Sequence, residues 1–143
     1  MSDDTNATLS GGLRWSAIWR PALSISVFLL PLALWQQWLI DRGTIERGGS
    51  ESMLFVALYL FLAAATGFAA ARMATARLLQ HGAAAAALAY CIVQGIGVVR
   101  HLISGEATGS FIGFAYLALL MATCGMLGAM LERRMRRLHA LRD

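Results

Sequence analysis

Gln94 is the most deeply placed strongly polar side chain in this sequence, about two helical turns inside one end of an apolar stretch, residues 82–99. Its amide can bond Thr66, Thr123 or a backbone carbonyl of a neighbouring helix, which contributes about 0.6 to 2 kcal/mol inside a membrane. The two threonine hydroxyls can also bond carbonyls of their own preceding turn. We interpret Gln94 as a structural hydrogen-bonding group and keep a substrate contact as the alternative.

Ionisable side chains are missing from the interiors of the apolar stretches. No Asp, Glu, Lys or Arg lies there except at the ends. Ionisable groups inside a membrane are the usual mark of an ion, proton or substrate pathway. A small multidrug exporter of this size would be expected to carry a glutamate within its first helix, and this chain has none there.

The histidines and cysteines do not form a recognisable reactive group. His81 and His101 stand at opposite ends of one predicted helix, about 30 Å apart, so they cannot share a metal within one subunit. Cys91 and Cys124 lie inside apolar stretches and outside any C-x-x-C pair. The sequence has no G-x-S-x-G, no H-E-x-x-H and no glycine-rich phosphate loop. We therefore expect no enzymatic activity, no cofactor and no metal.

Composition indicates that these side chains are positioned by membrane helices. Hydrophobic residues make up 58% of 143 positions and charged residues 14%, against about 25% charged in soluble domains. A membrane-spanning helix needs about 20 apolar residues. The sequence predicts an all-α, four-helix membrane bundle with spans at about 18–40, 53–71, 82–99 and 111–131. Residues 1–13 are expected to be a disordered tail and 132–143 a basic amphipathic tail.

The first predicted span carries all four tryptophans at its two ends. Trp15 and Trp19 flank one end and Trp35 and Trp38 the other, as aromatic belts do at membrane surfaces. Sixteen residues separate Trp19 from Trp35, about 24 Å of helix, close to the hydrocarbon thickness. Pro31 lies mid-span, where proline usually kinks a helix.

The arginine distribution predicts the orientation. All twelve basic residues are arginine, which fits GC-rich bacterial coding. Two in-out-in hairpins would place nine arginines on the side of the termini and three on the other side. The positive-inside rule then puts both termini in the cytoplasm of a bacterial cell, with the chain in its inner membrane.

Small residues recur at four-residue spacing along the predicted helices, a pattern that lets membrane helices approach closely. The spacing does not distinguish packing within one chain from a homo-oligomer or partner interface. The positions are Ala63, Gly67, Ala71, Ala83, Ala87, Cys91, Gly95, Gly109, Gly113, Gly125 and Ala129.

The two predicted hairpins show a faint similarity to each other. An offset of 61 residues carries Gly67 onto Gly128 and Arg72 onto Arg133, which suggests a hairpin duplication as a hypothesis. The segment of about ten residues between the second and third spans is predicted to form a helical turn or two on the membrane surface.

Arginines cluster beside the second span and in the C-terminal tail. We expect them to face anionic lipid headgroups, at about 1 kcal/mol each, or a docking partner. They are Arg72, Arg77, Arg133, Arg134, Arg136 and Arg137.

The pattern Gly67-x-x-Ala70-x-Arg72, followed by a short basic linker and His81-Gly82, resembles a bacterial family of small four-span, glycine/alanine-rich membrane proteins of unknown function. The resemblance covers residues 63–95 and implies an integral membrane protein, without an activity.

These observations predict a small accessory or interaction protein, a subunit or regulator of a larger membrane complex, with another membrane protein or a second copy as partner and no nucleic acid. The alternative is a small homo-oligomeric transporter or channel, in which Gln94 and the small-residue stripes line a path.

Overall fold

The computed structural model describes residues 15–46, 48–105 and 111–141, and this part of the chain forms four helices without a strand. They are α1 (Trp15–Asp41), α2 (Ser50–Met73), α3 (Leu78–Ser104) and α4 (Phe111–Ala140). Each is long and apolar enough to cross a membrane. The predicted all-α four-helix architecture is confirmed; the predicted tail at 1–13 and Gly109 lie outside the described residues.

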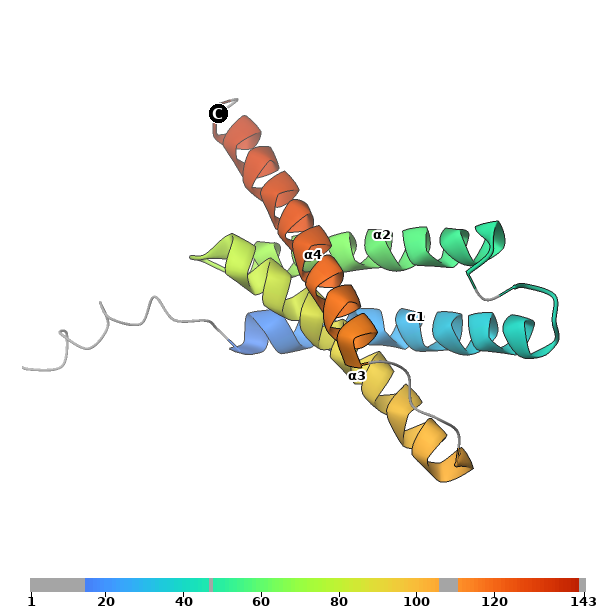
Figure 1. The fold of residues 1–143 in the computed structure, drawn as a ribbon. Helices are drawn as coiled ribbons and strands as arrows, with labels where there is room; N and C mark the ends of the chain where they lie inside the picture. The colour runs from blue at the N-terminus through green and yellow to red at the C-terminus, as the bar shows by residue number, and fades with distance from the viewer. Residues whose placement is uncertain (1–14, 47, 106–110, 142–143) are drawn as a thin grey trace, which may run out of the picture.

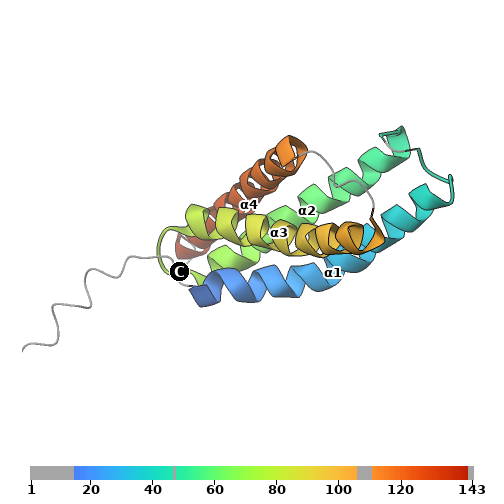
Figure 2. The same ribbon diagram turned by 60° about the horizontal axis from the view of Figure 1, so that its bottom comes forward.

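The helices form two hairpins that cross each other, α1 with α2 and α3 with α4 (Figure 1). Within the described residues, α2 and α3 each contact all the other helices, whereas α1 and α4 do not meet. A second view places α1 and α4 on opposite sides of the α2–α3 pair (Figure 2). The core therefore lies along α2 and α3.

The turn between α2 and α3 is shorter than the sequence suggested. Both helices continue into the segment that was predicted to form a helical turn or two, leaving four residues, 74–77, between them. Ala74 is extended and Arg77 has a positive φ of 51°, a conformation uncommon outside glycine. The predicted connection is thus helical in part, and the chain reverses through these extended and left-handed residues.

Glycines allow the closest approach between helices, where α2, α3 and α4 meet. A Cβ on Gly67 of α2 would overlap the Gly125 carbonyl of α4, and one on Gly128 would overlap the Ala64 carbonyl. A Cβ on Gly82 of α3 would also meet Gly125, at 2.7 Å from its carbonyl oxygen. Main chain therefore packs directly on main chain, which no larger residue permits at these positions.

The contact between α2 and α4 is reciprocal. Gly67 faces Gly125, three residues before Gly128, and Gly128 faces Ala64, three residues before Gly67. The offset of 61 residues noted in the sequence exchanges these two pairs. The α2–α4 contact therefore joins positions related by this offset, and the hairpin duplication stays a hypothesis.

α1 continues as one helix through both Pro21 and Pro31. Its tryptophans remain on the surface, between 47% and 73% exposed. At the end near the α1–α2 connection, the Arg42 guanidinium lies 3.9 Å from the centre of the Trp38 ring, and Trp35 packs edge-on against Phe55 of α2. These contacts place aromatic and cationic groups together at one end of the helices.

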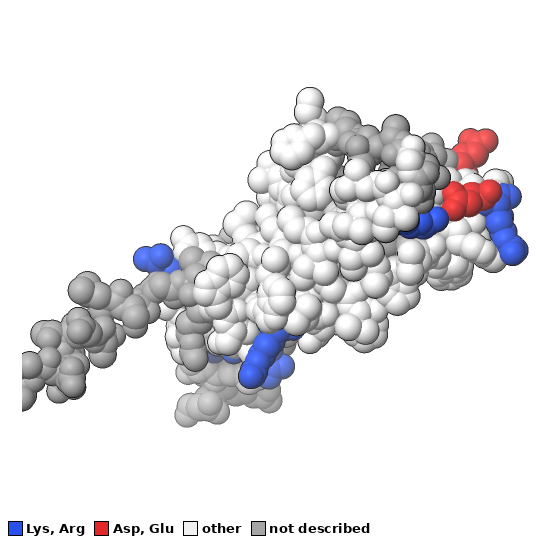
Figure 3. Space-filling model, turned by 90° about the horizontal axis from the view of Figure 1, so that it is seen from below, with Lys and Arg blue, Asp and Glu red and all other residues white. Residues whose placement is uncertain are grey.

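The surface between the two ends is apolar. On the face seen in Figure 3, a broad uncharged zone lies between charged residues towards its two ends, and the visible acidic residues lie at one of these ends. Large side chains such as Val27, Phe28, Leu119 and Leu127 are more than 60% exposed there. Apolar surface of this extent marks contact with lipid or with another protein.

Candidate functional site

A cavity of about 240 Å³ lies between α1, α2 and α3, in the half of the bundle nearest the α1–α2 connection. Its inner wall is apolar and includes Leu29, Ala63, Ala89 and Met121, the last contributed by α4. The alanine side chains in this wall are short and leave the cavity unfilled. The Tyr90 ring, 7% exposed, closes one side and is held by the Phe114 ring at 5.3 Å.

Polar side chains line the part of the cavity nearest the helix ends. The Tyr59 hydroxyl donates to Gln36 Oε1 at 2.7 Å, and Gln36 Nε2 donates to Ser52 Oγ at 3.3 Å. These two hydrogen bonds link α1 to α2. Gln37, also in the cavity wall, donates to Asp41 Oδ1 at 2.7 Å. In the sequence both glutamines stand between Trp35 and Trp38, and no pattern there indicates their partners.

Gln94 lies in the same wall, on α3. The predicted bonds to the two threonines do not form, because both hydroxyls donate within their own helices: Thr66 to the Leu62 carbonyl and Thr123 to the Leu120 carbonyl, each at 2.7 Å. In the part of the chain that the structure describes, the Gln94 amide has no hydrogen-bond partner. It is therefore available to a cavity occupant or to water.

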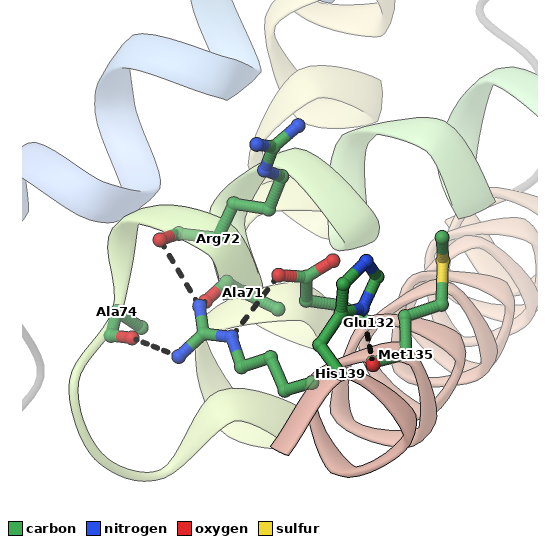
Figure 4. Close-up of polar contacts among 7 residues, drawn as sticks. Ala71, Arg72, Ala74, Glu132, Met135 and His139 are labelled. Atoms are coloured by element: carbon green, nitrogen blue, oxygen red, sulfur yellow. Dashed lines mark hydrogen bonds and ion pairs between the residues drawn. The ribbon is translucent and has the colours of Figure 1, made fainter. Parts of the chain in front are cut away.

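A second polar site lies at the opposite end of the bundle, where Arg136 of α4 contacts the end of α2 and Glu132 (Figure 4). We call this site the clasp. Arg136 of α4 donates through Nη2 to the carbonyls of Ala71 and Arg72, at 2.7 and 3.1 Å, and through Nε to Glu132 Oε1 at 3.0 Å. A longer contact of 3.5 Å reaches the Ala74 carbonyl. The last carbonyls of a helix lack partners within it and carry partial negative charge, so a guanidinium is well matched to them.

His81 supports the turn next to this clasp. The side chain is 1% exposed, and both its Nδ1 and its backbone nitrogen lie near the Arg77 carbonyl, at 3.1 and 3.2 Å. The ring therefore braces the left-handed residue of the turn. The sequence placed His81 at the membrane surface, and its burial was not predicted.

The predicted packing residues divide into two groups. Ala63, Gly67 and Ala71 of α2 and Gly125 and Ala129 of α4 are buried at helix contacts. On α3, however, Ala83 and Ala87 are half-buried and Cys91 and Gly95 exposed; Gly113 of α4 is exposed too. The buried small residues of α3 are Gly82, Ala85, Ala86 and Ala89.

The arginines that were predicted to face lipid headgroups also fall into two groups. Five side chains are exposed and make no hydrogen bond or ion pair among the described residues: Arg72, Arg77, Arg133, Arg134 and Arg137. Arg136 is different, because its guanidinium is used within the protein. Glu132, its partner, is 8% exposed and was not singled out in the sequence. The i,i+4 spacing of Glu132 and Arg136 was the available signal.

No group of three or more His, Cys, Asp or Glu side chains that could hold a metal ion occurs among the described residues. The site chemistry found there consists of hydrogen bonding and charge, in the cavity and in the clasp. Comparison with protein-family models, with curated proteins and with solved structures finds no match for this chain.

Proposed function

We propose that the chain is a multi-pass protein of the bacterial cytoplasmic membrane with both termini in the cytoplasm. The four long apolar helices support this proposal, as does the predicted excess of arginine at the end that carries the termini. Among the described residues, Asp41, Glu46 and Glu51 give the other end an acidic character. The resemblance to small four-span bacterial proteins, which rests on the sequence alone, also stays a prediction.

Cysteine labelling tests the orientation. In a background with Cys91 and Cys124 replaced by alanine, Ser50→Cys should react with a membrane-impermeant maleimide in intact cells, and Ala140→Cys should react only after the cells are opened. Labelling of Ala140→Cys from outside would contradict the proposed orientation, and loss of the protein from the membrane fraction would contradict insertion itself.

We further propose that the protein acts as an accessory or interaction subunit of a larger membrane assembly. The observation that carries this is the outward small-residue stripe of α3: Ala83, Ala87, Cys91 and Gly95 share a face that no helix of this chain covers fully. A Cβ added at Gly95 would meet nothing within 4 Å. Small residues on an apolar helix surface let the backbone of a further helix approach closely.

Crosslinking in native membranes tests this function. A stoichiometric partner should be recovered with the wild-type chain and lost with Gly95→Leu, because the larger side chain would separate the two helices. Ala57→Leu is the matched control, since Ala57 is exposed on α2, away from the stripe. Recovery of the chain as a pure homodimer, or an unchanged partner yield with Gly95→Leu, would refute the accessory role.

A homo-oligomeric transporter or channel is the second candidate, and the specific observation that favours it is the Gln94 amide in the cavity wall. Gln94→Leu should then abolish flux in liposomes while leaving assembly intact. Unchanged flux would remove Gln94 from a transport path.

A further inference from the structure

A second hollow adjoins the cavity along the seam between α1 and α3. This hollow, of about 160 Å³, is lined by seven residues, and three of them, Leu30, Val93 and Ile96, also line the cavity. Exposed Val27 stands at its outer side. We call these two adjoining hollows the groove: the outer hollow is lined mostly by apolar side chains, and the cavity also carries polar ones.

The polar end of the groove has a defined charge. Arg100 is the one charged residue that lines it, and in the described part of the chain its guanidinium forms no ion pair or hydrogen bond. Gln37 and the unpartnered Gln94 amide line the same region. The Asp41 carboxylate accepts a hydrogen bond from Gln37 and does not line the groove. An anionic group with several acceptor oxygens matches this set of donors.

The depth of these donors indicates where the anion comes from. Gln36 and Gln37 lie between Trp35 and Trp38 along α1, at the end where Arg42 stacks on Trp38. Tryptophan and arginine gather in this way at the level of lipid headgroups. The apolar part of the groove runs from there towards the middle of the helices, the direction that an acyl chain takes from its headgroup.

We propose that this groove binds one anionic phospholipid, with an acyl chain along the α1–α3 seam and the phosphate against Arg100. The proposal rests on the membrane insertion stated above, and the labelling experiment tests that insertion separately. The cavity is smaller than the 300–1,000 Å³ typical of pockets for drug-sized molecules. A single flexible chain fits such a narrow space, and its headgroup stays outside with the polar side chains.

Native mass spectrometry of the full chain in detergent micelles tests the proposal, with dioleoyl phosphatidylglycerol as the anionic probe and dioleoyl phosphatidylcholine as the zwitterionic one. The wild-type chain should retain one phosphatidylglycerol in preference to phosphatidylcholine. Gly97→Leu should weaken this binding about tenfold, because Gly97 lines the cavity and the new side chain would occupy it. Gly113→Leu is the control, since it adds the same side chain to an exposed glycine with open space around it.

Two further variants distinguish the effect of the cavity's shape on lipid binding from the effect of the Arg100 charge. Ala33→Phe narrows the cavity from α1 and should also weaken binding, so that misfolding of Gly97→Leu alone would not decide the result. Arg100→Gln should reduce phosphatidylglycerol binding about two- to fivefold and remove the preference over phosphatidylcholine. Helical circular dichroism and a single elution peak establish that each variant is folded. Wild-type affinity in both filled variants, or an unchanged lipid preference in Arg100→Gln, would overturn the proposal.

Discussion

Replacing Arg136 by methionine should destabilise the bundle by about 2–3 kcal/mol. The substitution keeps most of the side-chain length and removes the guanidinium, which donates to the Ala71 and Arg72 carbonyls and to Glu132. Hydrogen bonds to charged groups contribute about 1.5–3 kcal/mol each. The Arg136 side chain is 43% exposed, so water replaces part of what is lost, and the sum of the separate bonds would overestimate the effect.

The expected loss of stability in Arg136→Met distinguishes a contact between two helices from an ordinary ion pair within one helix. If Arg136 formed only an exposed i,i+4 pair within α4, its loss would cost about 0.3–0.5 kcal/mol. A larger cost is expected because the same guanidinium fastens α4 to the end of α2. Removal also leaves the Glu132 carboxylate, whose side chain is 10% exposed, without its partner.

Reversible unfolding in mixed detergent micelles, followed by circular dichroism, measures this difference. Arg137→Met is the matched control: Arg137 is the next residue of α4, is exposed and makes no hydrogen bond or ion pair with the described residues, so its loss should change stability by less than about 0.5 kcal/mol. A double-mutant cycle with Glu132→Gln should give a coupling energy of about 0.5–3 kcal/mol. Equal stabilities of the Arg136→Met and Arg137→Met proteins would refute the clasp.

Two other substitutions probe the contacts between helices, and the same unfolding assay measures both. Gly128→Leu should cost at least about 3 kcal/mol because a side chain there meets the α2 backbone, whereas Gly113→Leu, in open space, should change stability by about 1 kcal/mol or less; equal effects would show that α4 can shift freely. Tyr59→Phe should cost about 0.6–1 kcal/mol through loss of the bond to Gln36, and an unchanged protein would show that Gln36 finds another donor.

The apolar lengths of the sequence were sufficient to predict the four helices, but they could not identify every packing face. On α2, the four-residue series of Ala63, Gly67 and Ala71 predicted the buried face correctly, although alanine also occupies residues 64, 65, 69 and 70. On α3, five consecutive alanines, residues 83–87, make every face small. Residue spacing alone then cannot identify the face of α3 that packs. The face that contacts α4 carries Gly82 and Ala86, rather than the predicted series that begins at Ala83.

The role of Arg136 depended on geometry that no local pattern contains. It is one of four arginines within five residues, all with the composition expected of a segment on lipid headgroups. What singles it out is the crossing of α4 over α2, which brings residues more than 60 positions apart to hydrogen-bonding distance. His81 is a similar case, because its burial depends on the tight turn at Arg77.

The glycine contact and the cavity have a common origin in the way the hairpins cross. Main-chain packing at Gly67, Gly82 and Gly125 holds α2, α3 and α4 together near the α2–α3 turn, and Arg136 fastens the same end. Helices that cross must diverge away from the point of closest approach. The cavity lies on the side towards the α1–α2 connection, and there alanines such as Ala33 and Ala89 do not fill the widening space. Residues at one end of the bundle therefore set the width of the groove at the other.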